Sequence, residues 1–406
     1  MEKEYIRTTE HSVTLNVTGG KIDSFRELEK TNGTVRVYEN GCIGIAGCLG
    51  EPNEEELTAK AVEALAFGIP YPCDLGGPLE REDIRDEAEI IPVPQFIPVM
   101  QAFLDRLQEL CPKFAFSNKI YLMDSRTEYR NSAGRHLLSA GRMISIELIV
   151  QNRGSGNLFD TALVWEGTHF DADTVLALFK KQYDAFYTPV YLEPGRYPVV
   201  ADPSSLIGSF AQHFVGDLYA VGASLLSGKL GEKVFSDKLT VRDDRNPETS
   251  PATCFFDAEG CVAEYYRPTM VENGVLKGLI TTKKTAKQYG LSNLGTASAA
   301  YDGVPDLNVN RIWFEPTAGS LKELVPGKAV FIIMASGGDA TPDGHFATPV
   351  QMSYLLEDGE IVGRLPDISV SGDFFDMFGK DYIGAVKDDP QEGILLSAVM
   401  MDVVKG

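Results

Sequence analysis

The first fifty residues alternate apolar and polar positions in the manner of antiparallel strands. The alternation is clearest from His11 to Val17, which predicts a strand with one buried face. Asn32-Gly33 and Asn40-Gly41 are hairpin signals, because Asn-Gly accepts the positive φ of a tight turn. The chain therefore begins with a predicted β meander.

Apolar positions then change to a helical spacing. A helix is predicted from Glu54 to Phe67, capped by Asn53. A second helix carries its apolar stripe from Val99 to Leu110, and a third begins after Asp171 or Asp173. The acidic, proline-containing stretch of residues 80–94 is expected to be a connector.

The character of the chain changes near the turn sequence of residues 192–195. A strand follows at Tyr197–Val200, and an apolar helical segment is predicted from Leu206 to Leu226. Most of the remainder consists of short strands with glycine-rich turns. We therefore predict an α+β protein with an N-terminal α/β domain of strands and helices (residues 1–192) and a β-rich C-terminal domain (residues 193–406).

The net charge limits the classes of molecule that the protein can be expected to bind. With 37 Lys+Arg against 58 Asp+Glu, the chain carries −21, which repels phosphate backbones and anionic lipid surfaces. The charged start predicts no signal peptide, and no apolar run has a membrane-spanning length. Six scattered cysteines without a CxxC pair are typical of reduced thiols. These features predict a cytoplasmic protein that binds neither nucleic acid nor membrane.

Two groups of residues are candidates for chemistry. On one helix, His213 and Asp217 would share a face, where they could bind a metal or act as a base; a half-buried histidine paired with an acid is the alternative. Asp257 and Glu259, with the Asp243-Asp244 pair, could bind a cation or do acid–base work, although the sequence favours a solvated turn at residues 257–260. No HExxH, HxH, GxSxG or phosphate-loop pattern is present.

Five ordered blocks of the second half resemble the TldD/PmbA family. They are Gly222–Val234, Asp257–Gly260, Val271–Gly278, Leu356–Ile361 and Ile368–Asp373. The resemblance implies an N-terminal α/β part and a β-rich C-terminal domain. Some members of this family resemble zinc metallopeptidases, in which a His-Glu-x-x-x-His motif and a later cysteine hold the ion.

The zinc motif is missing from this sequence. Counting back without gaps from Ser224, the motif positions fall on Ile207, Gly208 and Gln212, and no cysteine follows Cys261. Isoleucine and glycine side chains offer neither a metal ligand nor a general base. The resemblance therefore implies a PmbA-like (TldE-like) member without metal, cofactor or catalytic residues of its own.

The resemblance also implies that such members pair with a TldD-type subunit and that the pair processes peptides. We accordingly expect a non-catalytic partner subunit, or a dimer with itself, that shapes a peptide cleft with His213, Asp217, Ser224, Asp257 and Glu259 as candidate lining residues. The alternatives are a self-sufficient hydrolase that uses His213, Asp217 or the acidic cluster, and a homodimeric peptide-binding scaffold.

Overall fold

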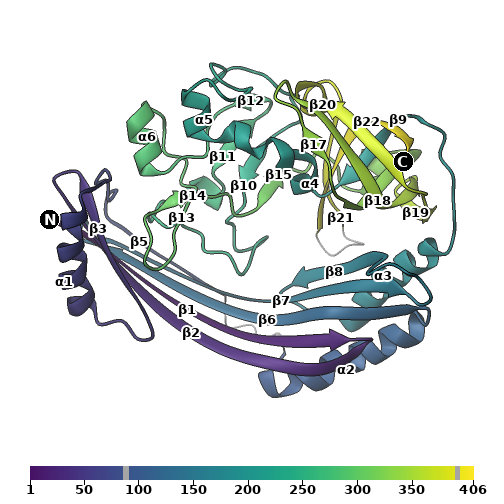
Figure 1. Ribbon diagram of the computed structural model, residues 1–406, viewed down its shortest axis with the longest axis horizontal. Coiled ribbons are helices and arrows are strands. Elements are labelled where there is room, and N and C mark those ends of the chain that lie inside the picture. Colours follow the sequence, from purple (N-terminus) through teal and green to yellow (C-terminus); the bar gives the residue numbers. More distant parts are fainter. Residues whose placement is uncertain (86–90, 389–393) are drawn as a thin grey trace.

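A computed structural model describes residues 1–85, 91–388 and 394–406. Its first half is built on an eight-stranded sheet in the order β4-β3-β2-β1-β6-β7-β5, with β8 also paired to β7. The strands are β1 (Glu2–Thr18), β2 (Lys21–Glu39), β3 (Cys42–Leu49), β4 (Ile69–Pro70), β5 (Leu79–Arg85), β6 (Phe114–Asn131), β7 (Arg135–Asn152) and β8 (Thr161–Gly167). The four longest strands form a curved layer beneath the C-terminal part (Figure 1).

Three helices accompany this sheet, and all three were predicted. They are α1 (Glu54–Ala64), continued by a 3₁₀ turn η1 (Leu65–Phe67), α2 (Val93–Leu110) and α3 (Ala172–Phe186). Asn53 caps α1 by accepting hydrogen bonds from two backbone N–H groups, and Asp171 caps α3 by accepting one from Thr174. The buried face of α2, with Phe96, Met100 and Phe103, packs in the main core on the side away from the C-terminal part (Figure 1).

One predicted hairpin is wrong. Asn40 and Gly41 do form the β2–β3 turn, with φ of 51° and 78°. Asn32 and Gly33 instead lie inside β2, in register with Thr8 and Arg7 of β1. The glycine is needed there because a Cβ on Gly33 would lie 2.3 Å from the Pro52 side chain, so the Asn-Gly signal reflects a close approach and not a turn.

The predicted connector of residues 80–94 is also wrong in part. Residues Leu79–Arg85 form β5, which pairs in parallel with the first half of β7, and α2 already begins at Val93. Residues 86–90 lie outside the described part of the chain. Most side chains of this edge strand are charged and exposed, so the sequence pattern did not predict a strand here.

The C-terminal part contains a second eight-stranded sheet, in which five strands close into a ring. This ring, called the barrel below, runs β16-β9-β22-β20-β18 and returns to β16. The strands are β9 (Gly195–Ala201), β16 (Lys328–Ala335), β17 (Asp339–Ala340), β18 (His345–Glu357), β19 (Glu360–Arg364), β20 (Ile368–Asp373), β21 (Tyr382–Asp388) and β22 (Ile394–Lys405). This confirms the α+β class with a β-rich second half.

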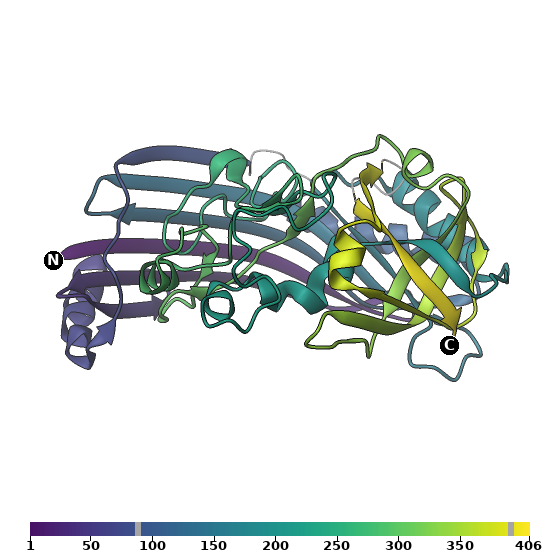
Figure 2. The same cartoon turned by 90° about the horizontal axis from the view of Figure 1, so that it is seen from above.

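Between β9 and β16, short elements lie above the long strands of the first sheet (Figure 2). They are α4 (Pro203–Ile207), η2 (Gly208–Phe214), α5 (Gly216–Ala220), β10 (Val241–Asp243), η3 (Glu264–Tyr266), β11 (Thr269–Glu272), β12 (Val275–Leu276), α6 (Lys283–Tyr289), β13 (Ala297–Ser298), β14 (Asp306–Leu307), β15 (Ile312–Phe314) and α7 (Leu321–Leu324); α8 (Phe374–Phe378) follows β20. The candidate site residues all belong to this region.

Neighbouring residues of β9 enter different cores, because side chains alternate along a strand. Val199 joins the core of the barrel, whereas Val200 joins the core formed by α2, α3 and the first sheet. That second core also contains Phe331 and Tyr354 of the barrel. This core contains residues from both sides of residue 192, so the division into domains 1–192 and 193–406 stays a prediction. Among the described residues, no helix has the length and apolar character of a membrane span.

Candidate functional site

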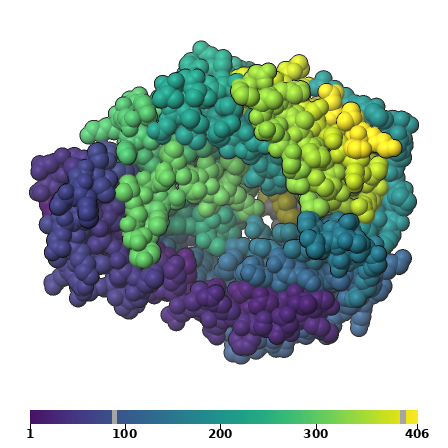
Figure 3. Space-filling view, in the orientation of Figure 1, coloured from purple at the N-terminus to yellow at the C-terminus, as the bar shows by residue number. Residues whose placement is uncertain are grey.

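A cleft separates the first sheet from the C-terminal part. It consists of two adjoining cavities of about 540 and 630 Å³, which share Ala252, Thr253 and Asn310 as lining residues. The surface is hollowed between the N-terminal strands and the C-terminal part (Figure 3). The floor of the smaller cavity includes alternate residues of β1, namely Ile6, Thr8 and Glu10. The sheet thus presents a mostly polar face to the cleft.

The loop of residues 245–254 lines both cavities and is fixed to the floor. A Cβ on Gly141 of β7 would lie 1.7 Å from the Pro251 carbonyl oxygen, so only glycine permits this approach. The Ser125 hydroxyl donates a hydrogen bond to the Ala252 carbonyl at 3.2 Å. The position of this loop therefore depends on a single glycine in the sheet.

A buried polar network joins the sheet to the C-terminal part at one end of the cleft. Glu4 accepts hydrogen bonds from the hydroxyls of Tyr38 and Tyr129 at 2.9 and 2.8 Å, and from Arg36 at 3.4 Å. Both Glu4 and Arg36 are almost fully buried. Arg36 also donates to the Ala258 carbonyl at 2.5 Å, which carries the network across the cleft.

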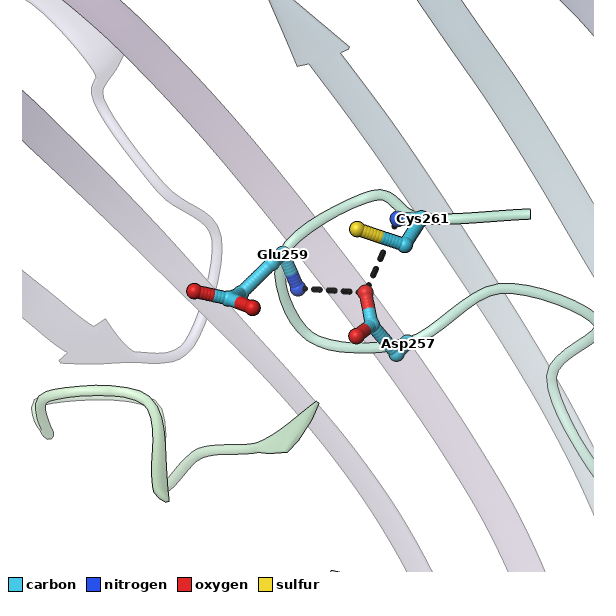
Figure 4. A group of neighbouring side chains, drawn as sticks. All are labelled: Asp257, Glu259 and Cys261. Atoms are coloured by element: carbon cyan, nitrogen blue, oxygen red, sulfur yellow. Dashed lines mark hydrogen bonds between the residues drawn. The ribbon is translucent and has the colours of Figure 1, made fainter. Parts of the chain in front are cut away.

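Asp257 stabilises the turn of residues 257–261, which contains the Ala258 carbonyl that Arg36 contacts. Its Oδ1 accepts from the backbone N–H groups of Glu259 and Cys261 at 2.9 and 2.8 Å (Figure 4). Its Oδ2 accepts from the backbone N–H of Ala297 at 3.1 Å. Asp257 and Glu259 are 2% and 1% exposed. The expected solvated turn is therefore wrong: the turn exists, but its carboxylates are buried between two parts of the fold.

Glu259 lies at the centre of this junction. Its carboxylate accepts hydrogen bonds from the Tyr71 hydroxyl and from the backbone N–H of Lys283 at the start of α6, while Lys283 Nζ donates to the Glu259 carbonyl at 2.9 Å. Burial, and then the nearby Asp257 carboxylate, raise the pKa of Glu259 to about 7. This carboxyl therefore titrates near neutral pH.

Asp257, Glu259 and Cys261 offer ligand atoms within 4.8 Å of one another (Figure 4). The donor set is poor for a cation, since both Asp257 oxygens already accept backbone hydrogen bonds. Burial also raises the pKa of the Cys261 thiol, so the thiolate that would bind metal is disfavoured. The ammonium of Lys283 lies beside the same turn. We assign no ion here.

The segment Leu206–Leu226 is not one helix. It is divided into α4, η2 and α5, and the extended backbone of Val215 (ψ 124°) separates the last two. Ile207 is buried and lines a largely apolar cavity of about 230 Å³, whereas Gly208 and Gln212 are exposed. The residues that the sequence predicts at the zinc-motif positions therefore do not fit a zinc ion, because Ile207 and Gly208 have no donor atom in their side chains and Gln212 does not line this cavity.

His213 and Asp217 do not form the predicted pair. His213 is buried among aromatic side chains, and its Nδ1 accepts a hydrogen bond from the Leu225 N–H at 3.3 Å. Burial lowers the pKa of His213. Asp217 instead accepts from the Thr285 hydroxyl at 2.9 Å. The kink at Val215 separates the two side chains.

Ser224 stabilises the backbone around His213 and Leu226 through two hydrogen bonds. Its hydroxyl donates to the His213 carbonyl at 2.6 Å and accepts from the Leu226 N–H at 3.0 Å. Of the five candidate cleft residues, Asp257 alone lines the cleft cavities. The cleft residues that sequence reasoning missed include Arg36 and Arg245, which are distant in sequence and belong to no motif.

Comparisons with known proteins agree on the fold. A crystal structure described as TldE from Thermococcus kodakarensis superposes with a TM-score of 0.80, covering 100% of this chain and 96% of its own at 18% identity. A curated relative from Archaeoglobus fulgidus named "Metalloprotease" is 27% identical over 95% of this chain and 92% of its own length.

Two further matches establish the family. The family description "PmbA/TldA metallopeptidase C-terminal domain" matches residues 194–404. A protein from Methanothermobacter thermautotrophicus, also named "Metalloprotease", is 33% identical over 90% of this chain and 83% of its own length. Such agreement along nearly the whole chain makes this protein a member of the TldD/PmbA family.

Proposed function

We propose that this protein is a non-catalytic, TldE-like subunit that binds peptides in the cleft and works with a TldD-type metallopeptidase subunit. One observation carries the proposal: the three positions where zinc-binding relatives would place two histidines and a glutamate are held by a buried isoleucine, an exposed glycine and an exposed glutamine. These side chains cannot activate water for attack on an amide.

The cleft supports peptide binding by its size and its chemistry. A peptide in extended form carries an N–H and a C=O at every residue, and both need partners when they leave water. Thr8, Thr34 and Thr127 on the sheet face Ser298 and Asn308 of the C-terminal part across the smaller cavity. These side chains can donate and accept hydrogen bonds without regard to the sequence of the peptide.

The free thiols fit a reducing compartment. All six cysteines are unpaired, and five of them are at least partly buried. Because disulfides are rare in the cytosol, this state supports work in the cytoplasm beside a cytosolic peptidase. The net charge of −21 supports peptide partners in preference to nucleic acid.

Metal analysis and a binding experiment test the proposal. The purified full chain should contain far less than one zinc per chain and should not cleave peptides alone. Mixed with a TldD-type protein of the same source, it should co-elute with that protein and raise its peptidase activity. Stoichiometric zinc together with peptidase activity of the isolated chain would refute the non-catalytic role.

The alternatives lead to different outcomes of the same experiment. A chain that elutes as a dimer with itself, binds peptide and ignores the TldD-type protein would be a homodimeric scaffold. Peptidase activity without metal would indicate a self-sufficient hydrolase. The structure does not favour the hydrolase based on His213 and Asp217, because their side chains bond to different partners.

A further inference from the structure

The outer edge of β2 is uncovered along its first half. β2 begins at Lys21, but β3 pairs with it only at residues 32–39, at the end of the sheet near α1 (Figure 1). No other strand pairs with this side of residues 24–31, called the open edge below, in the described part of the chain. The apolar side chains of Phe25 and Leu28 are 58% and 39% exposed there. The sheet therefore has room for one more strand beside this segment.

The backbone of the open edge presents hydrogen-bonding groups at alternate residues. Gly50, directly after β3, donates its N–H to the Thr31 carbonyl at 2.8 Å, so the polar groups of Thr31 point away from β1. These directions alternate along an antiparallel strand, and β2 keeps its register with β1 from Thr31 back to Phe25. The N–H and C=O groups of Phe25, Glu27 and Glu29 therefore point outward, as the addition of a strand requires.

The charged side chains of the open edge are sorted by face. Because side chains alternate along a strand, Arg26 and Lys30 lie on the face toward the cleft, and Glu27 and Glu29 lie on the opposite face. Glu27 contacts Nε2 of His11 at 2.9 Å, whereas the other three charges form no ion pair within the described part of the chain. The open edge is thus basic on one face and acidic on the other.

The open edge leads into the smaller cavity of the cleft. Lys30 lines that cavity together with Glu10, its partner in β1, and with Asn32, which follows in β2. A strand added beside the open edge would extend the sheet, so one of its faces would continue the floor of the cavity. A peptide that occupies the cleft can therefore continue along this edge.

A second copy of this chain is a poor occupant of the open edge. In a two-fold antiparallel pair, residues whose N–H groups point outward face one another. Pairing centred on Arg26, Glu27 or Glu29 places that residue opposite itself, and pairing centred on Leu28 places Glu27 opposite Glu29. Like charges directly opposite each other destabilise a sheet. The charge pattern therefore disfavours self-pairing and favours a strand with complementary charges.

We propose that the open edge of β2 binds the peptide as an additional antiparallel strand, in which acidic residues face Arg26 and Lys30 and basic residues face Glu27 and Glu29. This inference rests on the proposed peptide-binding function and deepens it. Main-chain hydrogen bonds supply affinity, and the charge pairs supply specificity. With an apolar residue opposite Leu28, the complementary peptide reads Glu-Lys-Val-Lys-Glu, the same in both directions.

Two fluorescein-labelled peptides of identical composition test the proposal with the unmodified full chain. One contains Ser-Val-Glu-Lys-Val-Lys-Glu-Val-Ser, and in the other every Glu is exchanged for Lys and every Lys for Glu, so both have the same length, apolar content and net charge. Fluorescence anisotropy gives each affinity. The complementary peptide should bind about tenfold or more tightly, because favourable charge pairs replace like-charge contacts at four positions.

Methylated backbones separate strand addition from attraction between charges alone. In antiparallel pairing the N–H groups of the two peptide lysines point at Glu27 and Glu29, so N-methylation of both lysines should lower the affinity about tenfold or more. N-methylation of both peptide glutamates, whose N–H groups point to solvent, is the matched control and should preserve binding. Equal affinity of the two methylated peptides would overturn the added strand.

An exchange of two adjacent charges locates the site. In Glu29→Lys/Lys30→Glu, each face of the open edge carries one charge of the wrong sign for the complementary peptide, so the affinity ratio of the two peptides should fall toward one. Glu63→Lys/Lys284→Glu, on α1 and α6, keeps the same net charge and should leave the ratio unchanged. All four substituted side chains are exposed, so both variants should fold.

The outcomes distinguish the possible occupants. Equal binding of the two charge patterns would overturn the added strand and leave peptide binding in the cleft intact, whereas no binding of either peptide would overturn both proposals. The exchange at residues 29 and 30 could instead change co-elution with a TldD-type protein, or the oligomeric state, and leave the peptide ratio as it was. The open edge would then belong to a partner subunit or to a second copy, and the proposal would be wrong.

Discussion

Arg36, on β2 of the first sheet, donates a hydrogen bond of 2.5 Å to the carbonyl oxygen of Ala258, 222 positions further along the chain. Arg135 of β7 makes a parallel contact of 2.6 Å to the Gly260 carbonyl. The turn of residues 257–261 is thus held from the sheet by two guanidinium groups. Because the same turn borders the cleft, the two walls of the cleft are fixed relative to each other at this end.

Replacing Glu4 with Gln should destabilise the protein strongly. Glu4 is the buried acid that balances Arg36, and removing one charge of a buried pair costs about 3–5 kcal/mol because the other is left uncompensated. Urea denaturation should show this loss. Glu29→Gln, at an exposed position of neighbouring β2, should change stability by no more than about 0.5 kcal/mol. Equal stability of the two variants would contradict the network.

Glu259 should make the protein less stable as the pH rises. Its pKa is raised from 4.5 to about 7 in the folded state, so the folded state binds the extra proton between these values. Stability from this group is then fully present below pH 4.5 and is lost as the pH rises through 7, with a slope of at most ~1.4 kcal/mol per pH unit. Glu259→Gln should remove this slope in urea denaturation series from pH 5 to pH 8. The same slope in both proteins would show that another group titrates.

His213 should produce the opposite trend. Burial lowers its pKa below the usual 6.5, so the unfolded state binds the proton first as the pH falls. Its contribution is present above pH 6.5 and is lost as the pH falls through the lowered value. In His213→Asn, an amide oxygen can accept from the Leu225 N–H, and acid-induced destabilisation should be smaller than in the wild type. A variant that loses stability just as steeply below pH 6.5 would contradict a buried neutral imidazole.

The sequence predicted elements well where local signals and burial agree. The capping residue Asn53, the apolar stripe of α2 and the Asn40-Gly41 turn all reflect short-range physics. The prediction failed at Gly33 and in residues 79–85, where a glycine serves a tertiary contact and a charged strand pairs at a sheet edge. Neither the approach of Pro52 to Gly33 nor the pairing of β5 with β7 can be deduced from the local sequence.

The site was predicted less completely for the same reason. The absence of zinc ligands at Ile207, Gly208 and Gln212 could be seen in the sequence, because it depends on residue identity. The pairing of His213 with Asp217 assumed a continuous helix, which the backbone at Val215 interrupts. The cleft arginines come together only through the packing of β2 against the loop that follows β10, and no local pattern encodes that contact.

Restoring the motif residues should not restore a zinc site. In Ile207→His/Gly208→Glu/Gln212→His, the first histidine would lie in the apolar cavity of about 230 Å³ that Ile207 lines, whereas positions 208 and 212 are exposed. The two histidine side chains would point to different sides, and no cysteine follows Cys261 in the chain to supply a thiolate. Elemental analysis after dialysis against zinc should give well below one ion per chain, as for Gln212→His alone. One tightly bound zinc per chain would mean that the backbone here adapts to the metal.

Gly141 should control the shape of the cleft. In Gly141→Ala the new methyl group would meet the Pro251 carbonyl at 1.7 Å, and because this neighbour is backbone, the loop of residues 245–254 must move. We expect the free energy of unfolding, measured by urea denaturation, to fall by about 1–3 kcal/mol. Peptide binding should also weaken, since this loop lines both cavities.

Gly208→Ala is the matched control for this substitution. Gly208 has helical φ (−55°), and no heavy atom lies within 4 Å of the position a Cβ would take, so the variant should be as stable as the wild type or gain up to about 1 kcal/mol. Its peptide affinity should not change. If Gly141→Ala behaved like Gly208→Ala in both measurements, the loop would be free to shift at no cost, and the sheet could not be what sets the width of the cleft.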